Sequence, residues 1–192
     1  MSITDRLQGL NIYLIGMMGS GKSTTATHLA RQLHYRYFDT DDLIEQVAGQ
    51  SVRDIFAQEG EAAFRQLESQ VLSQLSAYQR SVISTGGGIV VELSNWGFLR
   101  CGLVVWLDVS PDLLFQRLQA DQSRPLLQTA NPRQTLETIL DERRSRYQQA
   151  DLRIEVTAAD SPEQVSQRIL ATIPQVVKAK PTPSETANGT HS

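Results

Sequence analysis

Residues 16–23 read Gly16-Met17-Met18-Gly19-Ser20-Gly21-Lys22-Ser23, which satisfies the pattern Gly-x-x-x-x-Gly-Lys-Ser/Thr without a departure. An apolar segment at 11–15 precedes this stretch and predicts a buried strand. A segment with helical periodicity, 22–33, follows it. Strand, glycine-rich loop and helix in this order are typical of a loop that binds the phosphates of a nucleotide.

The chemistry of this loop predicts a role for each of its residue types. Glycines let backbone N–H groups turn toward a phosphate, and the helix N-terminus adds a positive dipole end. Lys22 is expected to reach the β- and γ-phosphates of ATP, and the Ser23 hydroxyl to bind Mg²⁺. A dinucleotide site is the alternative, with Asp39 as the ribose ligand, but Lys22-Ser23 stand where that motif needs a third glycine. Phosphoryl transfer is therefore favoured.

The rest of the chain alternates short apolar runs with helical patterns, which predicts an α/β fold. We expect the three-layer P-loop fold, with a five-stranded parallel sheet flanked by helices. The predicted strands are 11–15, 35–38, 81–85, 103–108 and 152–156, and the predicted helices are 22–33, 41–48, 52–58, 61–78, 111–120, 132–150 and 162–173. A single kinase domain is predicted over 1–174, with a mobile lid at about 119–132 and a disordered tail over 175–192.

Composition excludes several classes of protein. The 192 residues carry a net charge of −3, which argues against a nucleic-acid binder. Cys101 is the single cysteine, so neither an internal disulfide framework nor a multi-cysteine zinc site is possible. No apolar run is long enough to span a membrane, and the first residues lack the pattern of a signal peptide. A cytoplasmic protein without a membrane or nucleic-acid partner is expected.

Two further motifs lie at predicted strand ends, where an open parallel sheet binds its ligands. Asp39 and Asp41 follow the second strand and are candidates for Mg²⁺ and for substrate hydroxyls. Helix capping is the alternative for this pair, and both roles are compatible at Asp41. Gly86-Gly87-Gly88 follow the third strand, and we interpret them as a loop that contacts the substrate rather than as a loose turn.

Together with the P-loop, these motifs resemble the shikimate kinase family, and the resemblance extends over about 10–173. The P-loop alone is generic, but the combination is specific. The matching residues are Gly16–Thr24, Asp39-Thr40-Asp41, Ile44-Glu45, Ile55-Phe56, Gly60-Glu61, Phe64-Arg65, Glu68, Thr85-Gly86-Gly87-Gly88, Arg124-Pro125-Leu126-Leu127, Glu142-Arg143, Tyr147 and Pro162.

The resemblance implies an enzyme that transfers the γ-phosphoryl group of ATP to the 3-hydroxyl of shikimate, on the route to chorismate and the aromatic amino acids. It implies Mg²⁺ as cofactor and a monomer. The implied catalytic residues are Lys22, Asp39 and Arg124, with Arg124 delivered by the lid. The implied metal-binding residues are Ser23 and Asp39.

The resemblance also implies two sets of binding residues, and the arginines among them could not be selected from the sequence alone. The implied ATP-binding residues are Gly19, Ser20, Gly21, Lys22, Ser23, Thr24, Arg117, Arg124 and Pro162. The implied shikimate-binding residues are Asp41, Arg65, Gly86, Gly87, Gly88, Arg143, Phe56 and Phe64.

One departure from the family pattern lies close to this site. Ser145-Arg146 replace the usual Pro-Leu before Tyr147, which adds positive charge one turn from Arg143. Two alternative functions remain open at this point. They are another small-molecule kinase of the same fold, such as a gluconate or nucleotide kinase, and a binding protein without catalysis. Against the binding protein, each catalytic element of the family is present in the chain.

Overall fold

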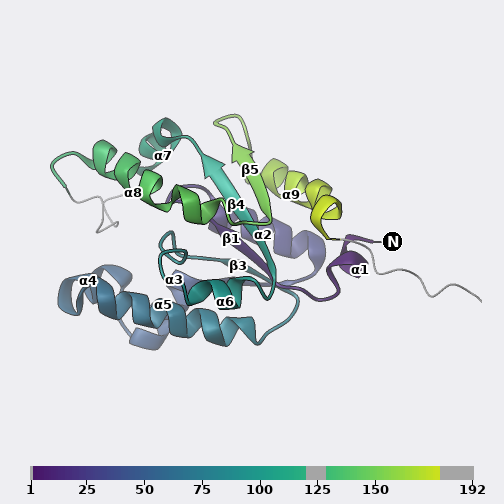
Figure 1. Ribbon diagram of the computed structural model, residues 1–192, viewed down its shortest axis with the longest axis horizontal. Helices are drawn as coiled ribbons and strands as arrows, with labels where there is room; N and C mark the ends of the chain where they lie inside the picture. The colour runs from purple at the N-terminus through teal and green to yellow at the C-terminus, as the bar shows by residue number, and fades with distance from the viewer. Residues whose placement is uncertain (1, 120–128, 178–192) are drawn as a thin grey trace, which may run out of the picture.

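The computed structural model describes residues 2–119 and 129–177, and within them five parallel strands form a single sheet (Figure 1). The strands are β1 (Ile12–Ile15), β2 (Arg36–Asp39), β3 (Ser81–Ser84), β4 (Leu103–Val109) and β5 (Leu152–Val156). Their order across the sheet is β2-β3-β1-β4-β5. The expected five-stranded parallel sheet is confirmed.

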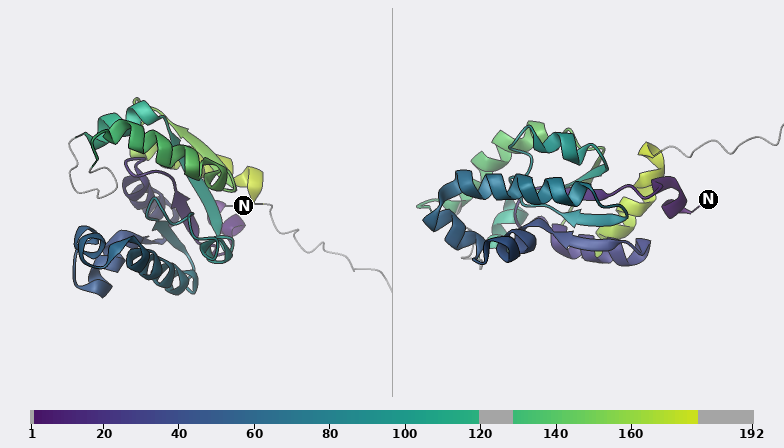
Figure 2. Two further views of the ribbon diagram at one scale, coloured as in Figure 1. Left: turned by 60° about the vertical axis from the view of Figure 1, so that its left-hand side comes forward. Right: turned by 90° about the horizontal axis from the view of Figure 1, so that it is seen from below.

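Helices cover both faces of this sheet. Their bounds are α1 (Ile3–Leu7), α2 (Lys22–Leu33), α3 (Thr40–Ala48), α4 (Val52–Gln58), α5 (Gly60–Ser76), α6 (Asn95–Leu99), α7 (Pro111–Leu118), α8 (Pro132–Tyr147) and α9 (Pro162–Val176). Helices α2 and α9 pack against each other on one face, and α5, α6 and α8 lie on the other (Figures 1 and 2). The result is the three-layer arrangement expected from the sequence.

Burial follows strand position. Every residue of β1 and β3 is buried, because these strands lie inside the sheet and helices cover both of its faces. In β5, which forms one edge, buried and exposed residues alternate. Strand β1 lies at the middle of the sheet, between β3 and β4, and the strand order reverses there. α/β proteins bind their ligands in the crevice that such a reversal creates at the carboxyl ends of the strands.

Several boundaries differ from the sequence prediction. Helix α9 continues through Pro174 to Val176, so the folded part extends beyond the predicted end at residue 174. Two five-residue helices, α1 and α6, were not predicted, because they are too short for an amphipathic period to be recognised. The remainder of the predicted tail, and most of the predicted lid, lie outside the described residues.

No helix in the described part of the chain is both long and apolar enough to cross a membrane.

Candidate active site

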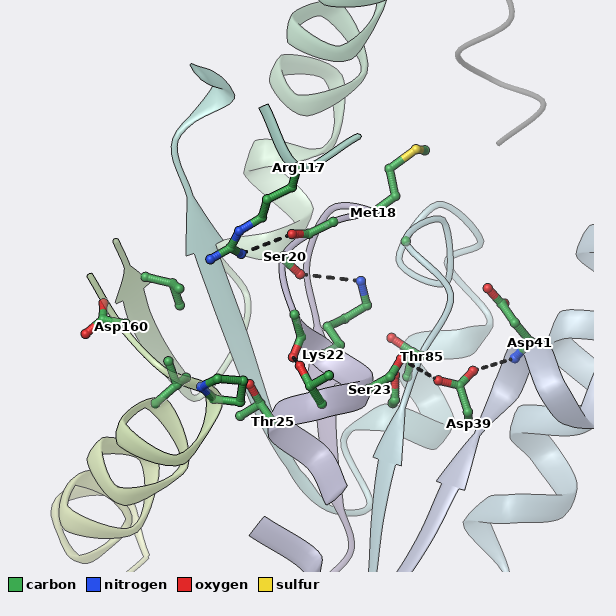
Figure 3. A pocket seen from close by; sticks show the side chains of 18 residues that line it. Met18, Ser20, Lys22, Ser23, Thr25, Asp39, Asp41, Thr85, Arg117 and Asp160 are labelled. Atoms are coloured by element: carbon green, nitrogen blue, oxygen red, sulfur yellow. Dashed lines mark hydrogen bonds between the residues drawn. The ribbon is translucent and has the colours of Figure 1, made fainter. Parts of the chain in front are cut away.

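The loop between β1 and α2 forms one wall of a cleft of about 380 Å³ at the carboxyl edge of the sheet (Figure 3). Gly16 has a φ of 143°, and a Cβ atom there would lie 2.7 Å from the carbonyl oxygen of Leu107 in β4. Gly21 caps α2 with a φ of 89° and no side-chain hydrogen bond. The first backbone N–H groups of α2 therefore meet no capping side chain, as is typical of an anion-binding helix terminus.

Lys22 is buried within this loop. Its Nζ atom donates hydrogen bonds to the carbonyl oxygens of Gly16, at 2.9 Å, and Met17, at 2.8 Å. Its side chain lines the cleft together with Ser20 and Ser23 (Figure 3). The positive charge is thus held on the inner side of the loop, where a phosphate group would contact it.

Asp39 is held by three donors, two from its own segment and one, Ser23, from the phosphate loop and helix α2. Its Oδ2 atom accepts hydrogen bonds from Ser23 Oγ, at 2.7 Å, and from Tyr37 Oη, at 3.3 Å. Its Oδ1 atom accepts one from the backbone N–H of Asp41, at 3.0 Å (Figure 3). The helix cap considered for Asp41 is therefore supplied by Asp39, at the N-terminus of α3. Asp41 lies in the first turn of α3, and both carboxylates line the cleft.

A second, smaller cavity of about 60 Å³ adjoins the cleft and shares Met18, Asp41 and Gly87 with it. Its walls come from α3, α4, α5, α8 and the loop after β3. All eight residues implied for the acceptor line it: Asp41, Phe56, Phe64, Arg65, Gly86, Gly87, Gly88 and Arg143. Val52 and Glu68 also line it, and no role for either was predicted from the sequence.

Arg65 and Glu68 form the most deeply buried ion pair of this cavity. Arg65 Nη1 donates to Glu68 Oε2 at 2.7 Å, and Glu68 is fully buried. Burial raises the pKa of Glu68 from 4.5 to about 7, and the nearby Arg65 charge partly opposes that rise. Burial alone would lower the pKa of Arg65, but Glu68 and Glu61 outweigh it and raise the pKa above its usual value. The guanidinium is therefore charged and held in place.

Space for this arginine is provided by the glycines after β3. A Cβ atom on Gly88 would lie 2.1 Å from Arg65 Nη1. A Cβ atom on Gly86 would lie 2.4 Å from Glu68 Oε1. The glycine loop therefore packs directly against the charged pair, and the interpretation of these residues as a loose turn is wrong.

Helix α8 brings a second arginine to the same loop. Arg143 Nη1 donates to the carbonyl oxygen of Gly87 at 2.9 Å, and Tyr147 Oη donates to that oxygen at 2.6 Å. Burial raises the pKa of Tyr147 to about 12, so this hydroxyl remains a donor near neutral pH. Arg143 and Tyr147, four residues apart on α8, thus both donate to the Gly87 carbonyl.

The end of the larger cleft away from Asp39 contains Arg117, one of the residues implied for ATP. Arg117 Nη1 donates to the carbonyl oxygen of Gly19 at 3.1 Å, which joins α7 to the phosphate loop. Asp160 lies on the same side of the cleft as Arg117 (Figure 3). Pro162 and Val165, which follow it in α9, also line the cleft. Arg124 lies outside the described residues. All other residues implied for ATP line the cleft.

The candidate metal ligands are two oxygen atoms rather than a cluster of side chains. No group of three or more histidine, cysteine, aspartate or glutamate residues forms a metal-binding cluster in residues 2–119 and 129–177. The Ser23 hydroxyl and the Asp39 carboxylate lie 2.7 Å apart beside the phosphate loop. Hard oxygen ligands of this kind suit a magnesium ion that is bound mainly through the phosphates of a nucleotide.

Comparison with known proteins gives one consistent result. A family model described as shikimate kinase matches residues 18–174. Shikimate kinase from Synechococcus elongatus is 53% identical over 178 residues, which cover 93% of this chain and 94% of that protein. The Microcystis aeruginosa enzyme is 53% identical over 90% of each chain. Among solved structures, shikimate kinase from Acinetobacter baumannii in complex with shikimate matches with a TM-score of 0.85 and 37% identity, over 90% of this chain and 97% of that one.

Proposed function

Since this chain belongs to the shikimate kinase family and transfers the γ-phosphoryl group of ATP to the 3-hydroxyl of shikimate, we propose that each of its two cavities binds one of the two substrates. ATP occupies the larger cleft along the phosphate loop, and shikimate occupies the smaller cavity. One observation carries this proposal. All eight residues implied for shikimate line a single cavity, and that cavity shares Met18, Asp41 and Gly87 with the phosphate cleft. The acceptor hydroxyl and the γ-phosphate therefore meet at these three residues.

In the smaller cavity, charge and shape are complementary to a small hydroxylated carboxylate. Arg65 and Arg143 reach it from α5 and α8 and pair with the carboxylate. Asp41 accepts hydrogen bonds from ring hydroxyls. The rings of Phe56 and Phe64, whose centroids are 4.8 Å apart, pack against the apolar part of the substrate. The relative from Acinetobacter baumannii was solved with shikimate, which supports this choice of ligand.

In the larger cleft, residues 19–24 surround the β-phosphate with backbone N–H groups. Arg117 and Pro162 border the adenine at the far end of the cleft. The hydrogen bond from Arg117 to Gly19 supports this assignment, because it fixes α7 relative to the phosphate loop.

The family implies a divalent metal with the nucleotide, and we propose that it is Mg²⁺, held by Ser23 and Asp39. The fit rests on the two adjoining oxygens described above and on the network around them. When bound, the ion neutralises charge on the β- and γ-phosphates. Binding of the ion would replace the hydrogen bond between Ser23 and Asp39. Tyr37 and the N–H of Asp41 would still keep the Asp39 carboxylate oriented.

Transfer then depends mainly on positioning and on charge neutralisation. Lys22 moves from the loop carbonyls to the transferring phosphoryl group and stabilises its developing charge. Asp39 orients the attacking hydroxyl and accepts its proton as the new bond forms. We also propose that Arg124, outside the described residues, joins Lys22 in this role when the segment at 119–132 closes over the cleft. Closure excludes water, which would otherwise hydrolyse ATP.

Both cavities are lined by residues of one chain, so we propose a monomeric enzyme with one catalytic domain. Light scattering during size-exclusion chromatography tests the monomer, and a stable dimer under assay conditions would contradict it. A cytoplasmic location stays a prediction.

A coupled assay of ADP release tests the activity and its acceptor. Shikimate is expected to stimulate ADP release strongly, whereas gluconate and a nucleoside monophosphate leave it at the background rate. Stimulation by gluconate would favour the other small-molecule kinases of this fold. Absence of any stimulation in a folded sample that binds ATP would favour a binding protein.

A further inference from the structure

The loop after β3 directs its carbonyl groups at side chains of the neighbouring helices. The Gly87 carbonyl accepts hydrogen bonds from α8, as described above. Beyond it, Asn95 Nδ2 donates to the Ile89 oxygen at 2.9 Å, and Trp96 Nε1 donates to the Val90 oxygen at 3.3 Å, both from α6. Three carbonyl groups of the loop, those of Gly87, Ile89 and Val90, are therefore held from outside by helix side chains.

These contacts help to decide the shape of the loop, because three consecutive glycines, Gly86–Gly88, follow its first residue, Thr85. Glycine loses more conformational freedom on folding than any other residue, and a run of three has no side chains of its own to anchor it. The peptide unit is planar and trans, so the carbonyl of Gly87 and the N–H of Gly88 point in opposite directions. With the Gly87 carbonyl directed at α8, the Gly88 N–H points away from that helix, and Gly88 lines the smaller cavity.

Arg146 holds the distal end of the same loop. Its Nη1 atom donates to the carbonyl oxygen of Val90 at 3.2 Å and also to that of Val91. Arg146 follows Arg143 by three residues and precedes Tyr147, so the last turns of α8 contact the loop at both ends. Arg146 is half-buried and lines neither the cleft nor the smaller cavity, so its charge is not directed at the carboxylate of a substrate.

We propose that Arg146 is a positioning residue for shikimate: by bonding the Val90 and Val91 carbonyls it fixes the glycine loop in the conformation that binds the acceptor. The inference rests on the proposed placement of shikimate against Gly86–Gly88. Within the loop, the N–H of Ile89 donates to the Gly86 oxygen and the N–H of Val91 to the Gly88 oxygen. A charged donor that holds two further carbonyls adds order to these turns of a glycine-rich segment. Loss of these bonds lets the loop sample other conformations, and shikimate must then order it on binding.

The test compares Arg146→Met, which keeps most of the side-chain length without the donors, with Arg146→Lys, which keeps one charged donor. Arg144→Met is the matched control, because Arg144 lies on the same helix and its ion pair with Asp141 spans 3.7 Å at the surface. We expect Arg146→Met to raise KM for shikimate about five- to twentyfold while KM for ATP changes less than about twofold. Arg146→Lys is expected to recover part of the loss, and Arg144→Met to behave as the parent enzyme.

Hydrogen exchange measured on the same variants separates this inference from the proposed site. Faster exchange at residues 86–91 in Arg146→Met, together with the rise in KM for shikimate, supports the proposal. Unchanged exchange there overturns the positioning role of Arg146. Faster exchange with unchanged KM for shikimate instead contradicts the placement of shikimate against the glycine loop. Equal rises in KM for both substrates, with exchange faster throughout the protein, would identify a purely structural residue and overturn the proposal.

Discussion

At the scale of the residue, the candidate active site is built from buried charged side chains, each of which has a hydrogen-bond or opposite-charge partner. Lys22, Arg65, Glu68 and Arg143 are each at most 8% exposed. A buried charge is costly unless hydrogen bonds or an opposite charge compensate it. Each of these four has such a partner, from the carbonyls around Lys22 to the carboxylate beside Arg65. Arg65, Glu68 and Arg143 are therefore oriented before the substrates bind, whereas the role proposed for Lys22 requires it to exchange the loop carbonyls for a phosphate.

Lys22 is the residue whose loss we expect to affect turnover most. Lys22→Ala removes the cation that we propose stabilises the transferring phosphoryl group, and kcat is expected to fall at least about a hundredfold. Steady-state kinetics with ATP and shikimate measure this. Arg31→Ala, which removes an exposed cation from the last turn of the same helix, serves as control and keeps normal kcat. Near-normal turnover in Lys22→Ala would refute the role assigned to the phosphate loop.

Asp41 is expected to act on one substrate. Asp41→Asn removes the charged acceptor that we propose for the shikimate hydroxyls, so KM for shikimate should rise roughly ten- to a hundredfold with little change in KM for ATP. The control is Asp42→Asn, since Asp42 is exposed and lines neither cavity. Equal loss for both substrates would instead indicate that Asp41 binds the metal.

Glu68 makes stability depend on pH in a direction opposite to most carboxylates. Its pKa is raised to about 7 in the folded protein, so between about pH 4.5 and 7 the folded state binds more protons than the unfolded state. Its contribution to stability is present at low pH and is lost as the pH rises toward 7. We expect the free energy of unfolding of the wild type to fall relative to that of Glu68→Gln between about pH 5 and pH 8, as measured by urea unfolding. Parallel pH profiles would contradict the raised pKa.

At the scale of the element, the glycine loop and the helices around it depend on one another. Helices α5, α6 and α8 are separated in sequence, yet side chains from all three contact the loop after β3. The loop supplies backbone groups and space, and the helices supply the charges. Neither could form this cavity alone.

Gly88→Ala tests that dependence. The added methyl group would meet the guanidinium of Arg65, which two glutamates hold in place, so the arginine or the loop must move. We expect KM for shikimate to rise about tenfold or more, at a stability cost of about 1–3 kcal/mol. Gly97→Ala in α6 is the matched control, because a Cβ atom there has no neighbour within 4 Å. If both variants bind shikimate normally, the contact between loop and arginine is not required.

At the scale of the whole molecule, the sheet joins two binding regions that come from distant parts of the chain. The phosphate loop follows the central strand. The larger cleft runs along this loop from Asp39 at the end of β2 to Val156 of β5 and to α9, and the smaller cavity adjoins it on the side of α3–α5. Ligands at both therefore stabilise the same folded unit.

Each substrate should consequently raise the melting temperature of the protein. At a concentration about a hundred times its Kd, a ligand adds roughly 2.7 kcal/mol, which corresponds to an increase in Tm of about 5–10 °C for a domain of this size. Thermal unfolding followed by circular dichroism measures the shift. Asp41→Asn should reduce the shift with shikimate and keep the shift with a non-hydrolysable ATP analogue. A variant that loses both shifts would indicate misfolding rather than a lost contact.

The amino-acid sequence by itself determined the features that depend on residues close together in the sequence. The phosphate loop is a contiguous pattern, and helices α2 and α4 were predicted with the bounds that they have. Gly49 ends α3 in the left-handed conformation, directly after the predicted end of this helix at residue 48. Family resemblance supplied the arginines, which the residues alone could not, because an arginine in solvent and one in a cavity have the same local sequence. The capping box of Ser2 and Asp5 was a usable signal for α1 that the periodicity analysis overlooked.

Only the tertiary structure decided which distant residues meet. The bond from Arg143 to Gly87 joins residues 56 positions apart, and the order of the strands brings them together. The burial of Glu68 follows from the packing of α5 against the glycine loop, and it produces a raised pKa that no local pattern predicts. Likewise, the departure at Arg146 suggested added charge at the site, whereas the structure turns that charge to backbone carbonyls. The burial of a side chain and the identity of its hydrogen-bond partners depend on how segments remote in the sequence pack together. The sequence alone therefore left both undetermined.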